Sequence, residues 1–164
     1  MKFANYLLLP SIYVFGEKSC PDHCLCDRGG YINCFNSNMT VFPDKFPQSA
    51  SVLKMERNRI RSVDMHTLLP YSTNLTSIFI SRNELISFRC SNQGYTFNFL
   101  TELDLSYNFL NFFAWDCMKK EMGSINISFL HLSRSRQFKN LEHEFLREMS
   151  QNKAAKTEVS TLEW

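Results

Sequence analysis

Three copies of one pattern decide the fold of this chain: Leu53-Lys54-Met55-Glu56-Arg57-Asn58, Ile78-Phe79-Ile80-Ser81-Arg82-Asn83 and Leu103-Asp104-Leu105-Ser106-Tyr107-Asn108. Each copy reads apolar, x, apolar, x, x, Asn, and the three asparagines follow one another at intervals of 25 residues. The residue two places after each asparagine is also apolar: Ile60, Leu85 and Leu110. A repeat of this length is typical of a solenoid, which is a stack of similar units. A solenoid offers a long stacked surface instead of an enclosed pocket, so the repeat favours a binding function.

Each copy has a direct structural interpretation. Alternating apolar positions point to one side of a strand, and the residues between them point to the other side. The asparagine follows the strand, where its carboxamide can donate to and accept from backbone groups that the turning chain leaves unpaired. We therefore expect Asn58, Asn83 and Asn108 to form a structural ladder that holds successive units in register.

The full pattern resembles the leucine-rich repeat, L-x-x-L-x-L-x-x-N-x-L, with its first position occupied by Ala50, Leu75 and Leu100. A fourth copy fits residues 127–135, where Ser135 replaces the asparagine. The resemblance implies an α/β solenoid, a short leucine-rich repeat horseshoe with a parallel β-sheet on its concave face. The repeats would occupy residues 50–138, with starts near 50, 75, 100 and 127.

Four of the six cysteines lie close together before the first repeat: Cys20, Cys24, Cys26 and Cys34. In an oxidising compartment such a cluster indicates a disulfide framework. A zinc site is the alternative, which the Cys24-x-Cys26 spacing disfavours. The cluster resembles the N-terminal cap (LRRNT) of extracellular leucine-rich repeat proteins. That resemblance implies a cysteine-rich cap over residues 17–49, with Cys20 bonded to Cys26 and Cys24 to Cys34, which would cover the open end of the core.

The other two cysteines, Cys90 and Cys117, fall in consecutive repeats at similar positions. We expect both on the back of the solenoid, on neighbouring units, and predict that they are bonded to each other. Two buried thiols, or a bond to another molecule, are the alternatives.

The N-terminus indicates a secreted, extracellular protein. Residues 1–16 read as a signal peptide, in which Lys2 precedes a mostly apolar stretch and cleavage follows Gly16. A buried first strand or an uncleaved anchor is the alternative. No later segment reaches about 18 apolar residues, so we expect no membrane span in the rest of the chain.

Three sequons fit a secreted glycoprotein: Asn38-Met39-Thr40, Asn74-Leu75-Thr76 and Asn126-Ile127-Ser128. Asn74 and Asn126 each precede the first position of a repeat, so a glycan there would leave from the loop that leads into a strand. That edge would then be shielded from a partner. The alternative is that a sequon has arisen by chance and stays unoccupied.

The exposed positions of the stacked strands are the expected ligand-binding surface, because they line the concave sheet. The candidates are Lys54, Phe79, Asp104 and His131 at the central outward position, and Arg57, Arg82, Tyr107 and Arg134 three residues later. We expect the residues that lie between these two sets to be exposed as well: Glu56, Ser81, Ser106 and Ser133. Arginine and aromatic side chains supply much of the energy of protein interfaces. The alternative is that these residues only solvate the sheet.

The sequence gives little support to catalysis. The four histidines are scattered, and neither a nucleophile motif nor a phosphate-binding glycine loop occurs. The segment 143–147 begins like a zinc-protease helix, but Arg147 replaces the second histidine ligand. We therefore expect no enzymatic activity, no bound metal and no cofactor.

Composition agrees with a single globular domain, since 44% of the 164 residues are apolar and 21% are charged. The formal net charge of +2 is too small to favour nucleic acid or an acidic membrane surface as a partner. The oligomeric state is left open.

The C-terminal residues 139–164 contain no cysteine, although extracellular leucine-rich repeat proteins usually end in a second cysteine cap. We expect a helix over 140–152 and a partly disordered tail. The chain as a whole resembles the N-terminal part of Toll-like and other leucine-rich repeat receptors. That resemblance implies a secreted protein that recognises a protein or microbial ligand, in innate immunity or adhesion. The alternatives are a truncated or variant ectodomain of a membrane receptor, and a structural protein of the extracellular matrix.

Overall fold

The computed structural model describes residues 19–89, 97–110 and 129–131. Their regular elements are short strands and one 3-10 helix: β1 (Leu25–Cys26), β2 (Tyr31–Asn33), β3 (Val52–Lys54), β4 (Ser62–Asp64), η1 (Met65–Tyr71), β5 (Ser77–Phe79), β6 (Ser87–Arg89), β7 (Glu102–Asp104) and β8 (Phe129–His131).

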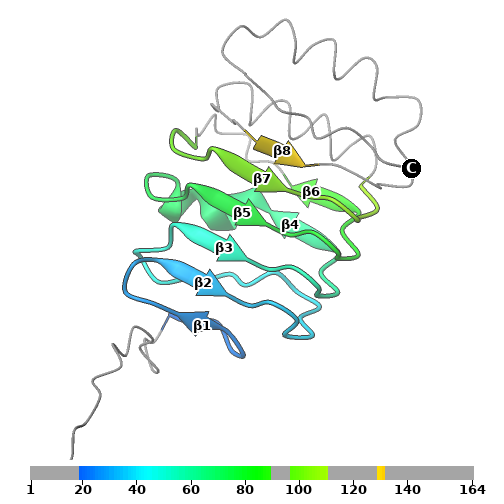
Figure 1. Cartoon of the computed structure of the whole chain (residues 1–164), viewed down its shortest axis with the longest axis horizontal. Coiled ribbons are helices and arrows are strands. Elements are labelled where there is room, and N and C mark those ends of the chain that lie inside the picture. The colour runs from blue at the N-terminus through cyan, green and yellow to red at the C-terminus, as the bar shows by residue number, and fades with distance from the viewer. Residues whose placement is uncertain (1–18, 90–96, 111–128, 132–164) are drawn as a thin grey trace, which may run out of the picture.

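Six of these strands form one mostly parallel sheet, in the order β1-β2-β3-β5-β7-β8. Strand β1 is antiparallel to β2, and each later pair in this sheet is parallel. Figure 1 shows these strands stacked in chain order, with β4 and β6 as a separate parallel pair behind them. The parallel sheet that the repeat predicts is thus confirmed. The β4–β6 pair is an addition that the repeat pattern does not predict.

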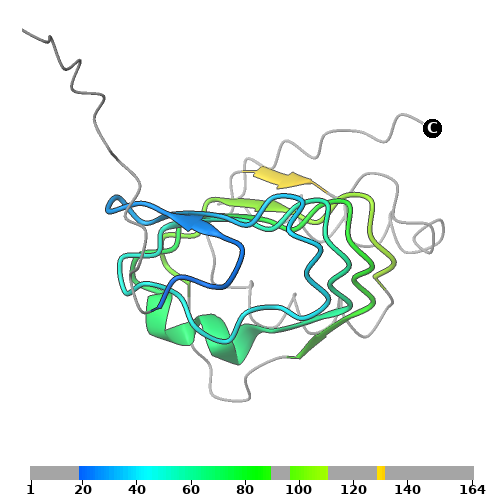
Figure 2. The same cartoon turned by 90° about the horizontal axis from the view of Figure 1, so that it is seen from below.

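The core lies between the six-stranded sheet and the elements opposite it. Pairing aligns Leu53 with Ile78 and Ile78 with Leu103, and all three side chains are buried. Val63 of β4 and Leu68 of η1 are buried on the other side. Figure 2, which looks along the stack, shows the sheet on one side and η1 with β6 on the other. Each such aliphatic side chain stabilises the fold by about 1.5–3 kcal/mol.

Buried asparagines connect successive repeats at the ends of the strands. The Nδ2 group of Asn83 donates to the carbonyl of Ile80 at 3.1 Å and to that of Met55, in the preceding repeat, at 2.9 Å. Its Oδ1 accepts from the backbone N–H of Ile60 at 3.0 Å. The asparagines of the other two copies bond in the same manner to the repeat or cap before them. These side chains thereby satisfy backbone groups that the turning chain leaves unpaired inside the protein.

A second ladder, made of hydroxyl groups, lies at the other end of the strands. Thr76 Oγ1 donates to the carbonyl of Ser51 at 3.1 Å, and Thr101 Oγ1 donates to the carbonyl of Thr76 at 3.2 Å. Ser51 Oγ donates in turn to the carbonyl of Gly29 at 3.2 Å. These positions count only as x in the repeat pattern, yet each links its unit to the one before.

Two disulfides fix the N-terminal cap, Cys20–Cys26 and Cys24–Cys34. The N-terminal disulfide pair that the sequence predicts is therefore present. Cys34 and Cys26 are buried with the core, so both bridges tie the cap to the stack. The cap also supplies β2, which pairs in parallel with β3 and so serves as the first parallel strand of the sheet.

Several predictions concern residues outside the described ranges. They are the signal peptide at 1–16, the Cys90–Cys117 bond, the sequon at Asn126, the candidate Arg134 and the C-terminal segment 139–164. These stay predictions, as do the boundaries drawn between the cap and the repeats.

Candidate binding surface

The open face of the six-stranded sheet carries the side chains that point away from the core. Pairing aligns Lys54 with Phe79 and Phe79 with Asp104, so these three predicted residues lie side by side on neighbouring strands. All three are half-buried. The backbone of His131 continues this line by pairing with Asp104. We call Lys54, Phe79 and Asp104 the strand row.

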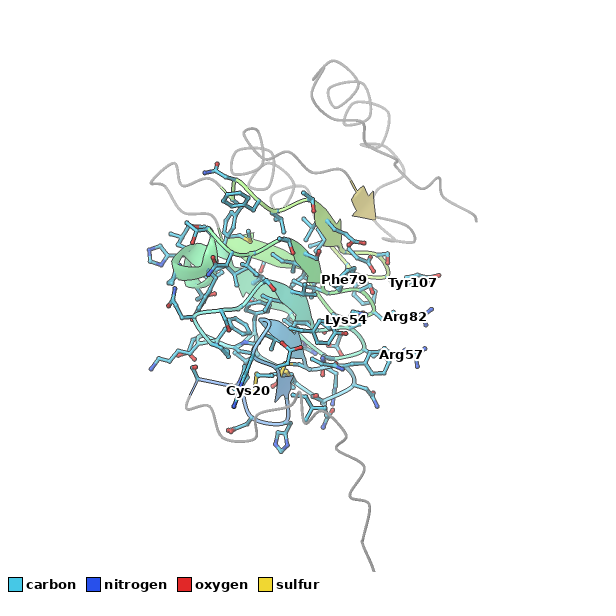
Figure 3. All side chains as sticks on the ribbon, turned by 60° about the vertical axis from the view of Figure 1, so that its left-hand side comes forward. Cys20, Lys54, Arg57, Phe79, Arg82 and Tyr107 are labelled. Atoms are coloured by element: carbon cyan, nitrogen blue, oxygen red, sulfur yellow. A yellow bond between two sulfur atoms is a disulfide. The ribbon has the colours of Figure 1, made fainter. Side chains whose placement is uncertain are left out.

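A second row, Arg57, Arg82 and Tyr107, lies in the turns that follow these strands, and we call it the turn row. Its residues are exposed and have φ values of 55°, 55° and 56°, in the left-handed region. Such a backbone costs a non-glycine residue about 1–2 kcal/mol. Figure 3 shows the turn row along one side of the stack, beside Lys54 and Phe79. The structure therefore brings Lys54, Phe79 and Asp104 of one predicted row, and Arg57, Arg82 and Tyr107 of the other, onto one surface.

Cation–π contacts within these rows cross from one repeat to the next. The Arg82 guanidinium lies 4.7 Å from the ring centroid of Tyr107, and Lys54 Nζ lies 5.0 Å from that of Phe79. At exposed sites such a contact contributes about 0.5–1 kcal/mol. Each ring thus contacts a cation of the preceding repeat.

The cap adds side chains that the repeat pattern does not point to. Phe35, just after β2, is 48% exposed, and its ring centroid lies 5.5 Å from the Arg57 guanidinium. Leu25 is also exposed and pairs with Asn33, which continues the strand row into the cap. One sequence signal could have pointed to Phe35 and Leu25. Residues 31–34 already alternate between outward and inward positions like a repeat strand, although no asparagine follows three residues later.

The acidic residues of this face are partly engaged. Glu56 Oε1 lies 3.6 Å from Lys54 Nζ, while Glu56 Oε2 is buried and has no hydrogen-bond partner among the described residues. Asp104 Oδ1 accepts from the backbone N–H of Ser106 at 3.0 Å and from its hydroxyl at 2.6 Å. The Asp104 carboxylate is thus oriented from within its own turn.

The expectation that Ser81 and Ser106 are exposed is wrong. Their exposed fractions are 8% and 7%. Both serines lie beyond the ends of their strands, where the strict alternation of a strand no longer applies. Their carbonyls accept from the buried asparagines that follow, at 3.3 Å in each case. The turn therefore buries the two serines and leaves the residue after each of them, Arg82 and Tyr107, exposed to solvent.

A separate group of charges lies farther along these turns. Arg59 Nε is 3.4 Å from Glu84 Oε1, and Arg61 Nε is 2.9 Å from Glu84 Oε2. The hydrogen bond from Arg61 lowers the pKa of Glu84 below its ordinary value, with a further contribution from Arg59, while desolvation opposes the shift. The Glu84 carboxylate thus balances two arginines of the preceding repeat.

Two of the predicted glycosylation sites fall in described residues, and both are exposed. Asn74 Nδ2 donates to the carbonyl of Gln48 at 2.9 Å, in the loop that leads into β5. Asn38 lies in the cap, with a φ of 55°. Their occupancy by glycans stays a prediction.

The residues that the structure describes contain neither a candidate metal site nor a candidate membrane helix. There, no cluster of three or more His, Cys, Asp or Glu side chains could hold a metal ion. Within the same ranges, no helix has the length and apolar character needed to cross a membrane. The expected lack of enzymatic activity, metal and cofactor stays a prediction.

Comparison with known proteins finds a distant relative. A peroxidasin homolog from Caenorhabditis briggsae is 35% identical to this chain over 71 residues. The match covers 42% of this chain but only 5% of that protein. No family model matches the chain. Peroxidasin is an extracellular protein that contains leucine-rich repeats, and the N-terminal disulfides and parallel sheet of this chain are consistent with a capped array of such repeats.

Proposed function

We propose that this chain is an extracellular leucine-rich repeat module that binds a protein or microbial surface ligand and acts by binding, not by catalysis. In this proposal the repeats stack as a short solenoid, and the open face of the six-stranded sheet is its concave, ligand-binding side. The in-register parallel strands, the buried asparagines and the distant similarity to peroxidasin support the proposed fold. The two disulfides support an extracellular location.

The observation that carries this proposal is the pairing of cations with aromatic rings across successive repeats. Arg82 lies over Tyr107 and Lys54 over Phe79, on one surface. A face that only needed to be solvated would require no large planar groups. Arginine and aromatic residues are enriched among the side chains that dominate binding energy. A cation already held by a ring also loses less freedom when a partner arrives.

The test identifies proteins that the glycosylated chain captures from extracellular fluid and compares their recovery by a Phe79→Ala, Arg82→Ala variant. We expect recovery to fall about tenfold or more, because loss of one hot-spot side chain costs roughly 2 kcal/mol. The matched control is Lys45→Ala, His66→Ala, since His66 is an exposed residue of η1 and Lys45 is exposed in the cap segment before it. Both variants should keep the melting temperature of the parent. Equal recovery by the face variant and the control would refute the proposal.

A further inference from the structure

Among the residues that the structure describes, Arg57 and Arg82 differ from Arg59 and Arg61 in having no acidic partner. Arg59 and Arg61, in the same turn region as Arg57, share the carboxylate of Glu84. In the part of the chain that the structure describes, neither Arg57 nor Arg82 is paired with a carboxylate. Both side chains are exposed, so their N–H donors face solvent. Two guanidinium groups on adjacent repeats are therefore open to an anion.

The backbone holds these two arginines next to each other, and aromatic rings draw their side chains apart. The N–H groups of Arg57 and Arg82 each donate to the following repeat, so their backbones are separated by about one strand spacing, roughly 4.8 Å. Like charges at that separation repel. Arg57 lies on Phe35, in the cap, whereas Arg82 lies on Tyr107, in the third repeat. The two side chains thus lean in opposite directions along the stack.

The local backbone also indicates that these side chains matter. Arg57 and Arg82 both have a φ of 55°, where glycine or asparagine would be less strained. The corresponding turn of the cap has Asn36 at this position, with a φ of 53°. A structural role alone would be met by such a residue. An arginine in two successive repeats, at a strained position, points to a use for the guanidinium itself.

We propose that Arg57 and Arg82 bind an acidic segment of a protein partner, in which carboxylates occupy alternate residues of an extended chain. Alternate residues of an extended chain point to the same side and lie about 6.6–6.8 Å apart. That spacing suits two guanidinium groups that lean apart from adjacent repeats, and each can bind a carboxylate through two parallel hydrogen bonds. Phe35 and Tyr107 are 48% and 36% exposed and contact the residues on either side. This inference rests on the proposed function and names the class of partner.

The charges elsewhere on the face favour an acidic peptide over a sulfated glycan. Glu102 and Asp104, both in β7, lie on the same sheet and have no cationic partner among the described residues. A uniformly anionic polymer that ran along the stack would meet these two carboxylates. A peptide can present acidic residues at the arginines and neutral or basic ones at β7.

The test measures binding of a labelled peptide of alternating glutamate and serine to the full chain, by fluorescence anisotropy at low salt. The matched probes are the same peptide with glutamine for glutamate, and a heparin fragment. We expect the glutamate peptide to bind at least about tenfold more tightly than the glutamine peptide, and its affinity to fall about tenfold in Arg57→Gln, Arg82→Gln. The control Arg59→Gln, Arg61→Gln should stay within about twofold, because those arginines already serve Glu84. Unchanged melting temperatures show that both variants fold.

Equal affinity for the two peptides, or an undiminished affinity in Arg57→Gln, Arg82→Gln, would overturn the inference. Tighter binding of heparin than of the glutamate peptide, lost in that same variant, would also overturn it and assign the site to a glycan. The two proposals fail separately. If partner capture depends on Phe79 and Arg82 while the glutamate peptide does not bind, the proposed binding face is supported and its specificity for acidic partners is refuted. If the Phe79→Ala, Arg82→Ala variant captures the partner as well as the parent does, the proposed function itself is refuted.

Discussion

The side-chain Oδ1 of Asn83 accepts a hydrogen bond from the backbone N–H of Ile60, in the preceding repeat, at 3.0 Å. The Nδ2 group of the same side chain donates to the carbonyl of Met55, also in the preceding repeat, at 2.9 Å. Asn83 is 5% exposed, so the Ile60 N–H cannot turn to water if the carboxamide is removed, whereas the Met55 carbonyl keeps a bond from Asn58 Nδ2 at 2.9 Å. One side chain therefore serves as a link between two units of the stack.

Replacing Asn83 with alanine should lower the free energy of unfolding by about 1–3 kcal/mol, the cost of leaving the buried Ile60 N–H without its partner. The carbonyls of Met55 and Ile80 keep the bonds that they accept from Asn58 and Asn108. Urea denaturation followed by circular dichroism measures the change. Asn98→Ala is the control, because Asn98 is exposed, and it should stay within about 0.5 kcal/mol of the parent. Similar decreases in the free energy of unfolding for the two variants would show that the hydrogen bonds of Asn83 do not stabilise the stack.

Gly30 should tolerate no side chain. Its φ is +87°, and a Cβ atom added there would lie 1.9 Å from the carbonyl oxygen of Ser49. Gly30→Ala should therefore cost more than about 3 kcal/mol or prevent folding, since backbone must move. At Gly29 the nearest atom to an added Cβ is Asp27 Oδ1, at 3.3 Å, so Gly29→Ala should change the melting temperature little. A stable Gly30→Ala protein would contradict the local geometry of the cap.

The hydroxyl of Tyr71 should stabilise the contact between η1 and the cap segment. It accepts from the backbone N–H of Phe46 at 2.9 Å and donates to the carbonyl of the same residue at 3.0 Å. Tyr71→Phe should lower the free energy of unfolding by about 1–3 kcal/mol, because both buried groups of Phe46 lose their partner. Tyr31→Phe removes a hydroxyl that has no hydrogen-bond partner within the described ranges, and it should cost less than about 0.5 kcal/mol. Equal costs in denaturant titrations would contradict this role.

Glu84 should titrate below its ordinary pKa of 4.5, chiefly because of its hydrogen bond from Arg61. A lowered pKa in the folded state means that ionised Glu84 favours folding above its unfolded pKa, and that this effect disappears as the pH falls through the folded value. Arg61→Gln should raise the Glu84 pKa toward 4.5, as measured by NMR titration of the side-chain carboxyl carbon. Lys45→Gln is the control and should leave it unchanged. The same Glu84 pKa with and without Arg61 would disprove the assignment.

The parallel sheet could be predicted from the sequence because three copies carry the same alternation at the same interval. Leu53, Ile78 and Leu103 each occupy one place in the pattern, and the sheet aligns those places. The β4–β6 pair could not be predicted in this way. Its strands have three residues each, and Val63 is the buried residue of β4, which is too short a signal to separate from a loop. The hydroxyl ladder was equally hidden, because serine and threonine at its positions look like solvent-exposed residues.

The strand row could be predicted from the sequence, because its residues follow the alternation within a strand. The residues in the turns beside it could not all be predicted, because their exposure depends on the backbone geometry of the turn. Ser81 is buried because the strand has already ended and Arg82, with a φ of 55°, reverses the local direction. No sequence rule used for strands describes such a turn. Phe35 was missed because the cysteines of the cap define it as a separate unit, although β2 pairs with β3 as the repeats pair with each other.

The open face of the sheet is the proposed binding surface, and hydrogen–deuterium exchange of the chain with and without a captured partner tests that claim most directly. We predict slower exchange in the bound state at the turns that carry Arg57 and Arg82. Exchange in η1 and β4, on the other side of the core, should stay the same. Protection confined to η1 and β4, with those turns unaffected, would contradict the assignment of the binding face.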